Sequence, residues 1–220
     1  MLAAHALAEK LWADGLKAAL AQPANARLGP ALERAAADAC RHAVGTLGLL
    51  GQLELAAPAL ERLWSATSRS ASFAPLGRFA RGGLPGAEFA VAAQLLLLAG
   101  LLMVGVNYCE SSYDPHRELA GQILEEAAEH EKLFAAGLEA GLEPDGVEAL
   151  EQALGRWLPA GLDCFGPPGS GFCCQCLRFG LKAVDNGELA GLFGELVQRR
   201  FAALGVKCPP VGQDYPRAAV

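Results

Sequence analysis

The most restrictive feature of this sequence is the run from Phe89 to Val106, whose 18 residues are apolar except for Gln94. That length is the lower limit for a transmembrane helix. A helix that is hydrophobic on all sides is otherwise found at the centre of a large core. Acidic residues, Glu88 and Glu110, lie near the two ends, and no Lys/Arg asymmetry flanks the run. We therefore expect a central buried helix and no membrane insertion, with a membrane span as the alternative.

The rest of the chain also has a helical composition. Ala, Leu, Glu and Gly dominate, β-branched residues are few, and no long segment alternates apolar and polar residues as a half-buried strand does. With 220 residues and a mass of 22.9 kDa, the chain is long enough for one sizeable core and does not require a second domain. We predict a single all-α domain over residues 1–220.

Proline, glycine and capping residues divide the chain into expected helices. Pro58 suits a first helical turn, Pro75 is expected to interrupt the helix that Pro58 begins, and Asp114 is placed to cap the helix that Pro115 starts. The expected helices cover about 2–21, 31–54, 58–80, 87–109, 115–140, 146–162, 172–183 and 186–204. We predict that the second to fifth form a ferritin-like four-helix bundle. The first is expected to be an amphipathic surface helix, with 1–30 as an additional helix and linker and 208–220 as an extended tail.

Charge and cysteine content narrow the function. The chain has 18 Lys and Arg against 24 Asp and Glu, a net charge of −6, and its basic residues are scattered, so we expect no nucleic-acid partner. Seven cysteines in a chain without the features of a secretory signal favour reduced thiols and a cytoplasmic location. Cys173 and Cys176, with Cys164 and Cys208, are either zinc ligands or buried free thiols, and we favour thiols because a second C-x-x-C pair is missing.

The pair Glu126 and His130 points to metal chemistry. Helix bundles build two-iron sites from a Glu three residues before a His, but Ala127 stands at that position, and Glu126 is four residues before His130. Residues four apart share a helix face, so His42, Glu126 and His130 can form a two-histidine, one-carboxylate iron site. The alternative, which we favour, is that His130 is a core histidine hydrogen-bonded to Glu126 or His42.

An ordered series of short motifs resembles one protein family. The motifs are Ser112-Tyr113-Asp114-Pro115, the Glu126/His130 helix, Arg156-Trp157-Leu158-Pro159, Asp163 to Pro167, Leu181-Lys182, Asn186-Gly187-Glu188-Leu189 and Leu204 to Pro209. Together they resemble the phenylacetic acid catabolic family, the ferritin-like subunits of phenylacetyl-CoA epoxidase, over about residues 31 to 210. The resemblance implies a helical subunit of a multicomponent enzyme in which a two-iron oxygenase subunit pairs with a related subunit that carries no iron.

The metal ligands that the resemblance implies are mostly replaced in this chain. The six family positions correspond here to His42, Phe73, Leu76, Leu98, Ala127 and His130, of which at most two have a side chain that binds metal. The four-residue spacing of Glu126 and His130 is closer to that of the iron-free partner subunit. We therefore expect no intact two-iron site and no required cofactor, with iron in a reduced site as the alternative.

Two further groups of polar residues are candidates for ligand binding. Lys182, Arg178 and Arg156 are basic residues for the phosphates of an acyl-CoA, the substrate type that the resemblance implies, although exposed basic residues are more often simply solvated. Ser65, Thr67, Ser68, Ser70 and Ser72 form a polar row that lines either a ligand cavity or an outer helix face. The turn from Gly166 to Gly171 matches no phosphate-loop spacing.

Three functions are compatible with these patterns. The first is a metal-poor relative of phenylacetyl-CoA epoxidase subunits that acts in assembly or binds an acyl-CoA-like ligand, either as a homo-oligomer or paired with a related subunit. The second is an iron-dependent monooxygenase that uses His42, Glu126 and His130. The third is a helical bundle that binds a small molecule without catalysis.

Overall fold

Helices make up the regular structure of the chain. The computed structural model describes residues 1–84, 86–140 and 146–210, and every regular element within these ranges is a helix, which confirms the all-α prediction. The elements are α1 (Leu2–Leu20), η1 (Pro23–Leu28), α2 (Gly29–Gly51), α3 (Ala57–Ser68), η2 (Ala71–Phe73), α4 (Ala74–Ala80), α5 (Gly86–Leu102), the π-helical η3 (Met103–Tyr108), α6 (Asp114–Ala140), α7 (Gly146–Asp163), α8 (Gly171–Arg178) and α9 (Asn186–Ala203). Most of the expected tail, 211–220, lies outside the described residues.

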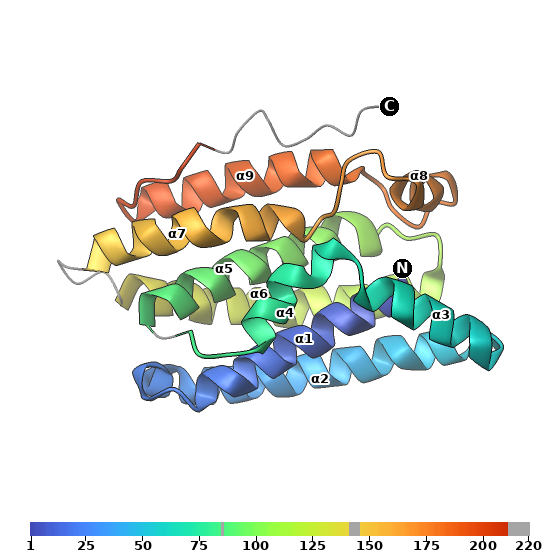
Figure 1. Ribbon diagram of the computed structural model, residues 1–220, viewed down its shortest axis with the longest axis horizontal. Helices are drawn as coiled ribbons and strands as arrows, with labels where there is room; N and C mark the ends of the chain where they lie inside the picture. Colours follow the sequence, from blue (N-terminus) through green and yellow to red (C-terminus); the bar gives the residue numbers. More distant parts are fainter. Residues whose placement is uncertain (85, 141–145, 211–220) are drawn as a thin grey trace.

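The long helices α1, α2, α5, α6, α7 and α9 run lengthwise through the molecule (Figure 1). Helices α1 and α2 form one antiparallel pair, and α5 and α6 form another. The long connection between the pairs carries α3 and α4 across the bundle, and α2 packs against α6 to join them. Helix α7 packs on α5, and α9 contacts both. The molecule is therefore two helical hairpins with a long crossover, covered on one side by α7 and α9.

The first helix belongs to the core, contrary to the expectation that it lies on the surface. Helix α1 packs along the length of α2 and is also covered by α4. Trp12 and Leu16 are buried in the main core, and Gly15 lies so close to the Phe79 ring that a Cβ there would overlap it. Small and apolar residues occupy more than one face of α1, which permits close packing on two sides. The prediction of an additional N-terminal helix outside the bundle is therefore wrong.

Helix α3 is peripheral, although the sequence favoured it as a core helix. None of its residues is buried. The chain leaves α3 at Ser68 and restarts as α4, with Pro75 in the first turn, so the predicted interruption is confirmed. This segment is too short and too polar to span the bundle, and α1 takes the core position that we assigned to it.

Helix α5 is the buried central helix that the apolar run predicts. Residues Val91, Ala92 and Leu95 have no exposed surface, and α6, α7 and α9 all contact the helix. In the described part of the chain, the segment Gly86–Tyr108 is the one helix long and apolar enough to cross a membrane, a criterion that core helices also meet. Here 61% of its most apolar window is buried within the protein.

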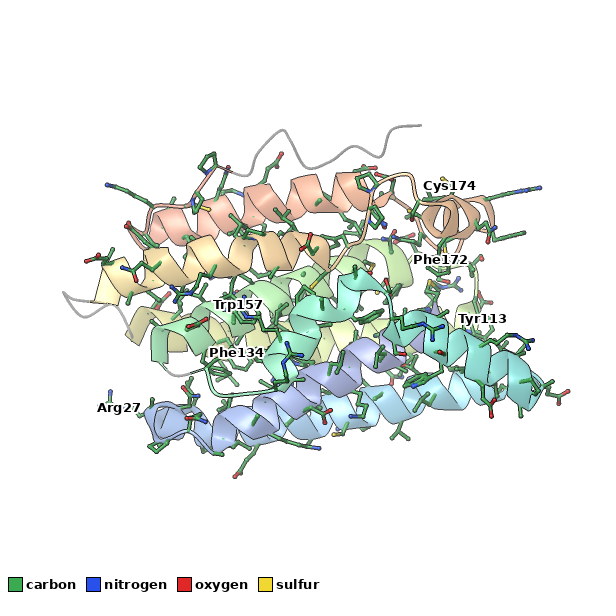
Figure 2. All side chains as sticks on the ribbon, in the orientation of Figure 1. Arg27, Tyr113, Phe134, Trp157, Phe172 and Cys174 are labelled. Carbon is green, nitrogen blue, oxygen red and sulfur yellow. The ribbon has the colours of Figure 1, made fainter. Side chains whose placement is uncertain are left out.

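Aromatic rings join α1 to α7 through the middle of the bundle. The Phe79 ring stacks on Trp12 at a centroid distance of 5.0 Å and on Phe89 at 5.9 Å, and it meets the edge of Trp157 at 6.5 Å. Figure 2 shows Trp157 and Phe134 at the centre of the molecule. Trp157 donates its Nε1–H to Glu88 Oε1 at 3.1 Å, so its one polar group is satisfied. This cluster fixes α4 between the two hairpins.

The close approach of α1 to Phe79 predicts the effect of a single methyl group. We expect Gly15→Ala to lower the free energy of unfolding by about 1–3 kcal/mol, because Phe79 is held by its aromatic neighbours and cannot move aside. The matched control is Gly48→Ala on α2, where no atom lies within 4 Å of the added Cβ. Because Ala has a higher helix propensity than Gly, Gly48→Ala should be as stable as the wild type or up to about 1 kcal/mol more stable. Equal changes in the free energy of urea unfolding for Gly15→Ala and Gly48→Ala would contradict this packing.

Candidate functional site

A cavity of about 580 Å³ extends from the surface into the bundle. Residues of α1, α2, α5, η3 and α6 line it, and the crossover and the segment from the end of α7 to the start of α9 complete its wall. Most of the lining is apolar, including Trp12, Leu96, Leu97, Met103 and Ile123. The size and the small number of polar groups are typical of a site for a small organic molecule.

One wall of the cavity carries a connected set of ionisable side chains from α1, α2 and α6. We call this set the histidine–carboxylate chain. It comprises His116, His5, Glu9, His42, Glu126, Arg41, Asp38 and His130, and so contains all four histidines of the sequence. His5, Glu9, His42 and His130 line the cavity itself. The chain therefore links the cavity wall to the half-exposed Arg41 at the outer surface.

The contacts along the chain are short. His5 Nδ1 and His116 Nε2 share a hydrogen bond of 2.9 Å. The two oxygens of Glu9 lie 3.5 Å from His5 Nε2 and 3.5 Å from His42 Nδ1, and His42 Nε2 is 2.7 Å from Glu126 Oε2. At the outer end, Arg41 donates to Glu126 Oε2 at 2.6 Å and to Asp38 Oδ1 at 2.8 Å, and Asp38 Oδ2 is 3.0 Å from His130 Nε2. Three helices are thus held together by charge.

Glu9 is the central carboxylate of this chain. Burial alone would raise its pKa, but the neighbouring imidazoles of His42 and His5 outweigh burial and lower the pKa to about 2. Burial likewise tends to lower the pKa of His42, and the Glu9 and Glu126 carboxylates overcome this and raise it. Glu9 and His42 therefore form a buried ion pair at the cavity wall.

At the two ends of the histidine–carboxylate chain, His116 and His130 have lowered pKa values, in contrast to His42. Burial, followed by the charge of His5, lowers the pKa of His116 to about 3, so His116 is neutral at physiological pH. Its ring packs 4.8 Å from the Tyr108 ring, and burial raises the pKa of the Tyr108 hydroxyl. Burial also lowers the pKa of His130, despite the nearby Asp38 carboxylate. Among the described residues, the Nδ1 atoms of His116 and His130 are buried without a hydrogen-bond partner.

The structure brings two of the three residues of the predicted iron site together. His42 and Glu126 are in direct contact, and Arg41 bonds to both Glu126 and Asp38. His130 hydrogen-bonds to Asp38, so the favoured expectation that it bonds to Glu126 or His42 is wrong. In residues 1–84, 86–140 and 146–210, no group of three or more His, Cys, Asp or Glu side chains is arranged to hold a metal ion. Metal binding at His42, Glu126 and His130 stays a prediction, and it would require Arg41 to leave Glu126.

Sequence reasoning missed His5, Glu9 and Asp38. The signal for the first two is present, since His5 and Glu9 are four residues apart on an otherwise apolar stretch of α1 and therefore share one face. This signal carries no weight when α1 is expected on the surface. The set of acids considered for a metal site therefore lacks Glu9 and Asp38.

Other predicted candidates separate into those at the cavity and those away from it. Thr67, Ser70 and Ser72 of the polar row line the cavity, as does Lys182. Arg156 pairs with Glu88, and Arg178 lies over the exposed Phe179 ring, so neither lines the cavity. All seven cysteines are free. Of these, Cys173 and Cys176 are buried, and burial raises the pKa of Cys164 to about 12, in accord with the thiol prediction.

The π-helical η3 positions one side of the cavity. It places the amide of Asn107 in the interior, where Asn107 Oδ1 accepts hydrogen bonds from the backbone of Ala183 at 2.9 Å and Val184 at 3.0 Å. Ser112 fixes the same segment through its backbone N–H to Gly180 O at 2.7 Å. The loop that carries Lys182 is thereby anchored to the end of the central helix, and π-helical turns are frequent at functional sites.

No protein-family model matches this chain, and no curated protein matches it. Its function must therefore be inferred from the geometry of the cavity and its lining.

The ion pair of Glu9 and His42 predicts a characteristic pH dependence. We expect Glu9→Gln to lower the free energy of unfolding by about 2–4 kcal/mol between pH 4.5 and 6.5, where both partners are charged. The gap to the wild type should narrow as pH falls from 4.5 towards 2, because Glu9 then becomes protonated in the folded protein. It should also narrow above pH 6.5, as His42 loses its proton.

Urea unfolding from pH 3 to pH 8 measures this gap. The exposed Glu118 on α6 gives a matched control, and Glu118→Gln should follow the wild type at every pH. A gap for Glu9→Gln that does not vary with pH would show that the Glu9 charge contributes nothing to stability.

Proposed function

We propose that this protein is a helical bundle that binds an apolar or acyl-type small molecule in its interior cavity. The observation that carries the proposal is the cavity of about 580 Å³ with a mainly apolar lining. The cavity opens to solvent, because Gly100 and Phe172 of its lining are exposed, so an organic molecule can enter it. Such a molecule would cover the apolar lining and remove it from water.

We further propose that the bundle is ferritin-like and related to phenylacetyl-CoA epoxidase subunits. Two helical hairpins joined by one long crossover are the topology typical of ferritin-like folds. The chain would then belong to the metal-poor branch, since Arg41 and the histidines pair with the carboxylates that face the interior. In this proposal the cavity keeps a ligand-binding role where relatives hold two irons.

Quenching of Trp12 fluorescence tests the cavity directly, because this tryptophan lines it. We expect 10-bromodecan-1-ol, whose bromine quenches indole fluorescence on contact, to quench the wild type in a saturable way. The quenching should be lost in Trp12→Phe, which keeps Trp64 and Trp157. Saturable quenching that persists in Trp12→Phe would place the ligand elsewhere, and no saturable quenching would contradict the proposal.

Filling the cavity from α5 should abolish binding without loss of stability. Gly100 lines the cavity, and no atom lies within 4 Å of a Cβ at this position. We expect Gly100→Leu to weaken 10-bromodecan-1-ol binding by about tenfold or more and to leave the melting temperature unchanged or higher, because added apolar volume replaces the ligand. Gly48→Leu, at an equally open position on α2 away from the cavity, is the control and should bind as the wild type does. Equal affinities for Gly100→Leu and the wild type would contradict this location.

A second candidate function, an iron-dependent monooxygenase, is favoured by one observation. His42 and Glu126 are 2.7 Å apart, and His42 lines the cavity, so a metal held there would face a bound substrate. Elemental analysis of protein from iron- and zinc-supplemented cells tests it. Iron near one per chain that disappears in His42→Ala, but not in the Glu118→Gln control, would support the oxygenase and displace the binding-only proposal. Absence of bound metal would contradict the oxygenase and leave the first proposal, a small-molecule binding protein, in place.

A further inference from the structure

Among the described residues, the cavity lining contains a single Lys or Arg side chain, and it is buried. Lys182 lines the wall formed between α8 and α9 and is 9% exposed. Its Nζ donates to Asn186 Oδ1 and lies 3.8 Å from Cys173 Sγ. Within the described ranges, no carboxylate lies within ion-pair distance of Nζ. A buried ammonium group that has only neutral partners is unusual, because the loss of hydration is not repaid by an opposite charge.

The position of Lys182 is fixed before any ligand arrives. Asn107 holds the two residues after it, and Asn186 donates its side-chain N–H to Pro167 O at 3.1 Å. Gly166, with φ of 76°, lets the adjoining turn approach Asn186 and Ser72 closely. Ser72 and Ser170 add hydroxyl groups to the same part of the cavity lining. A rigid cation with hydroxyl neighbours is the arrangement that binds an anion at low entropic cost.

The charges of the rest of the lining select one kind of anion. The histidine–carboxylate chain already pairs its cations, Arg41 and His42, with the acids Asp38, Glu9 and Glu126. That wall offers no unpaired cation to a second anion. Lys182 is the one Lys or Arg side chain among the described lining residues, and it lies next to a long apolar surface, which suits a ligand with an anionic end and an apolar body.

We infer that the cavity binds a monocarboxylic acid with an apolar tail, and that Lys182 pairs with its carboxylate. This inference rests on the proposed function and adds the chemical class of the ligand. It predicts that the acid binds more tightly than an uncharged molecule of the same length. The tail lies along the apolar residues of α5, and Asn186 holds the ammonium group in place.

Paired ligands of equal length test the inference. We expect 10-bromodecanoate to quench Trp12 at a concentration about tenfold or more below that needed for 10-bromodecan-1-ol. In Lys182→Met, the affinity for the acid should fall to that for the alcohol, while the affinity for the alcohol stays unchanged. Lys207→Met removes an exposed charge and should behave as the wild type.

The outcomes separate the inference from the function on which it rests. If the acid and the alcohol bind the wild type equally well, the role of Lys182 is refuted and the cavity proposal stands. If neither ligand binds, both are refuted. If the Lys182→Met variant does not fold, the ratio of the two affinities in the wild type decides. A ratio near one refutes the inference, and a ratio of about ten or more supports it.

Discussion

Burial of the apolar helix α5 is the constraint on which the rest of this structure depends. Its apolar surface must be covered everywhere, and α6, α7 and α9 supply most of that cover. Gln94, the one polar residue of the apolar run, is also paired, since it donates to Glu131 of α6 at 3.0 Å and Glu131 pairs with Arg200 of α9. The remaining side of α5 faces the cavity. Incomplete packing of the most hydrophobic helix is therefore what creates the binding space.

The opposite wall solves a different physical problem, the burial of charge. Glu9 enters the interior from α1, and it is stable there because imidazoles from α1 and α2 lie on both sides of it. Each further member of the histidine–carboxylate chain compensates its neighbour until Arg41 reaches the surface. A bundle held in this way is specified by pairing as well as by packing, because removal of one partner leaves the others uncompensated. The same pairing occupies the groups that a metal would need.

Lys182 is a buried charge whose side-chain hydrogen-bond partners are neutral. Its loop is anchored by Asn107 of the π-helical η3, a local departure from α-helical geometry at the end of the central helix. The uncompensated charge and the unfilled space lie at the same cavity. One molecule of the proposed kind, an acid with an apolar tail, would pair with the charge and fill the space, and this coincidence is the reason for the proposal of ligand binding.

The sequence by itself determined the helical class, the central position of α5, the interruption at Pro75 and the free thiols, because each follows from local periodicity, backbone restriction or composition. It also pointed to His42 and Glu126 as neighbours. It did not determine which helices form the core, and it assigned α1 to the surface and the α3 segment to the bundle. Only the tertiary structure decided these points, because the burial of a helix depends on what packs against each face. For the same reason, the meeting of His5, Glu9 and His42 from two helices was not readable from sequence spacing. Nor was the absence, within the described residues, of a carboxylate beside Lys182.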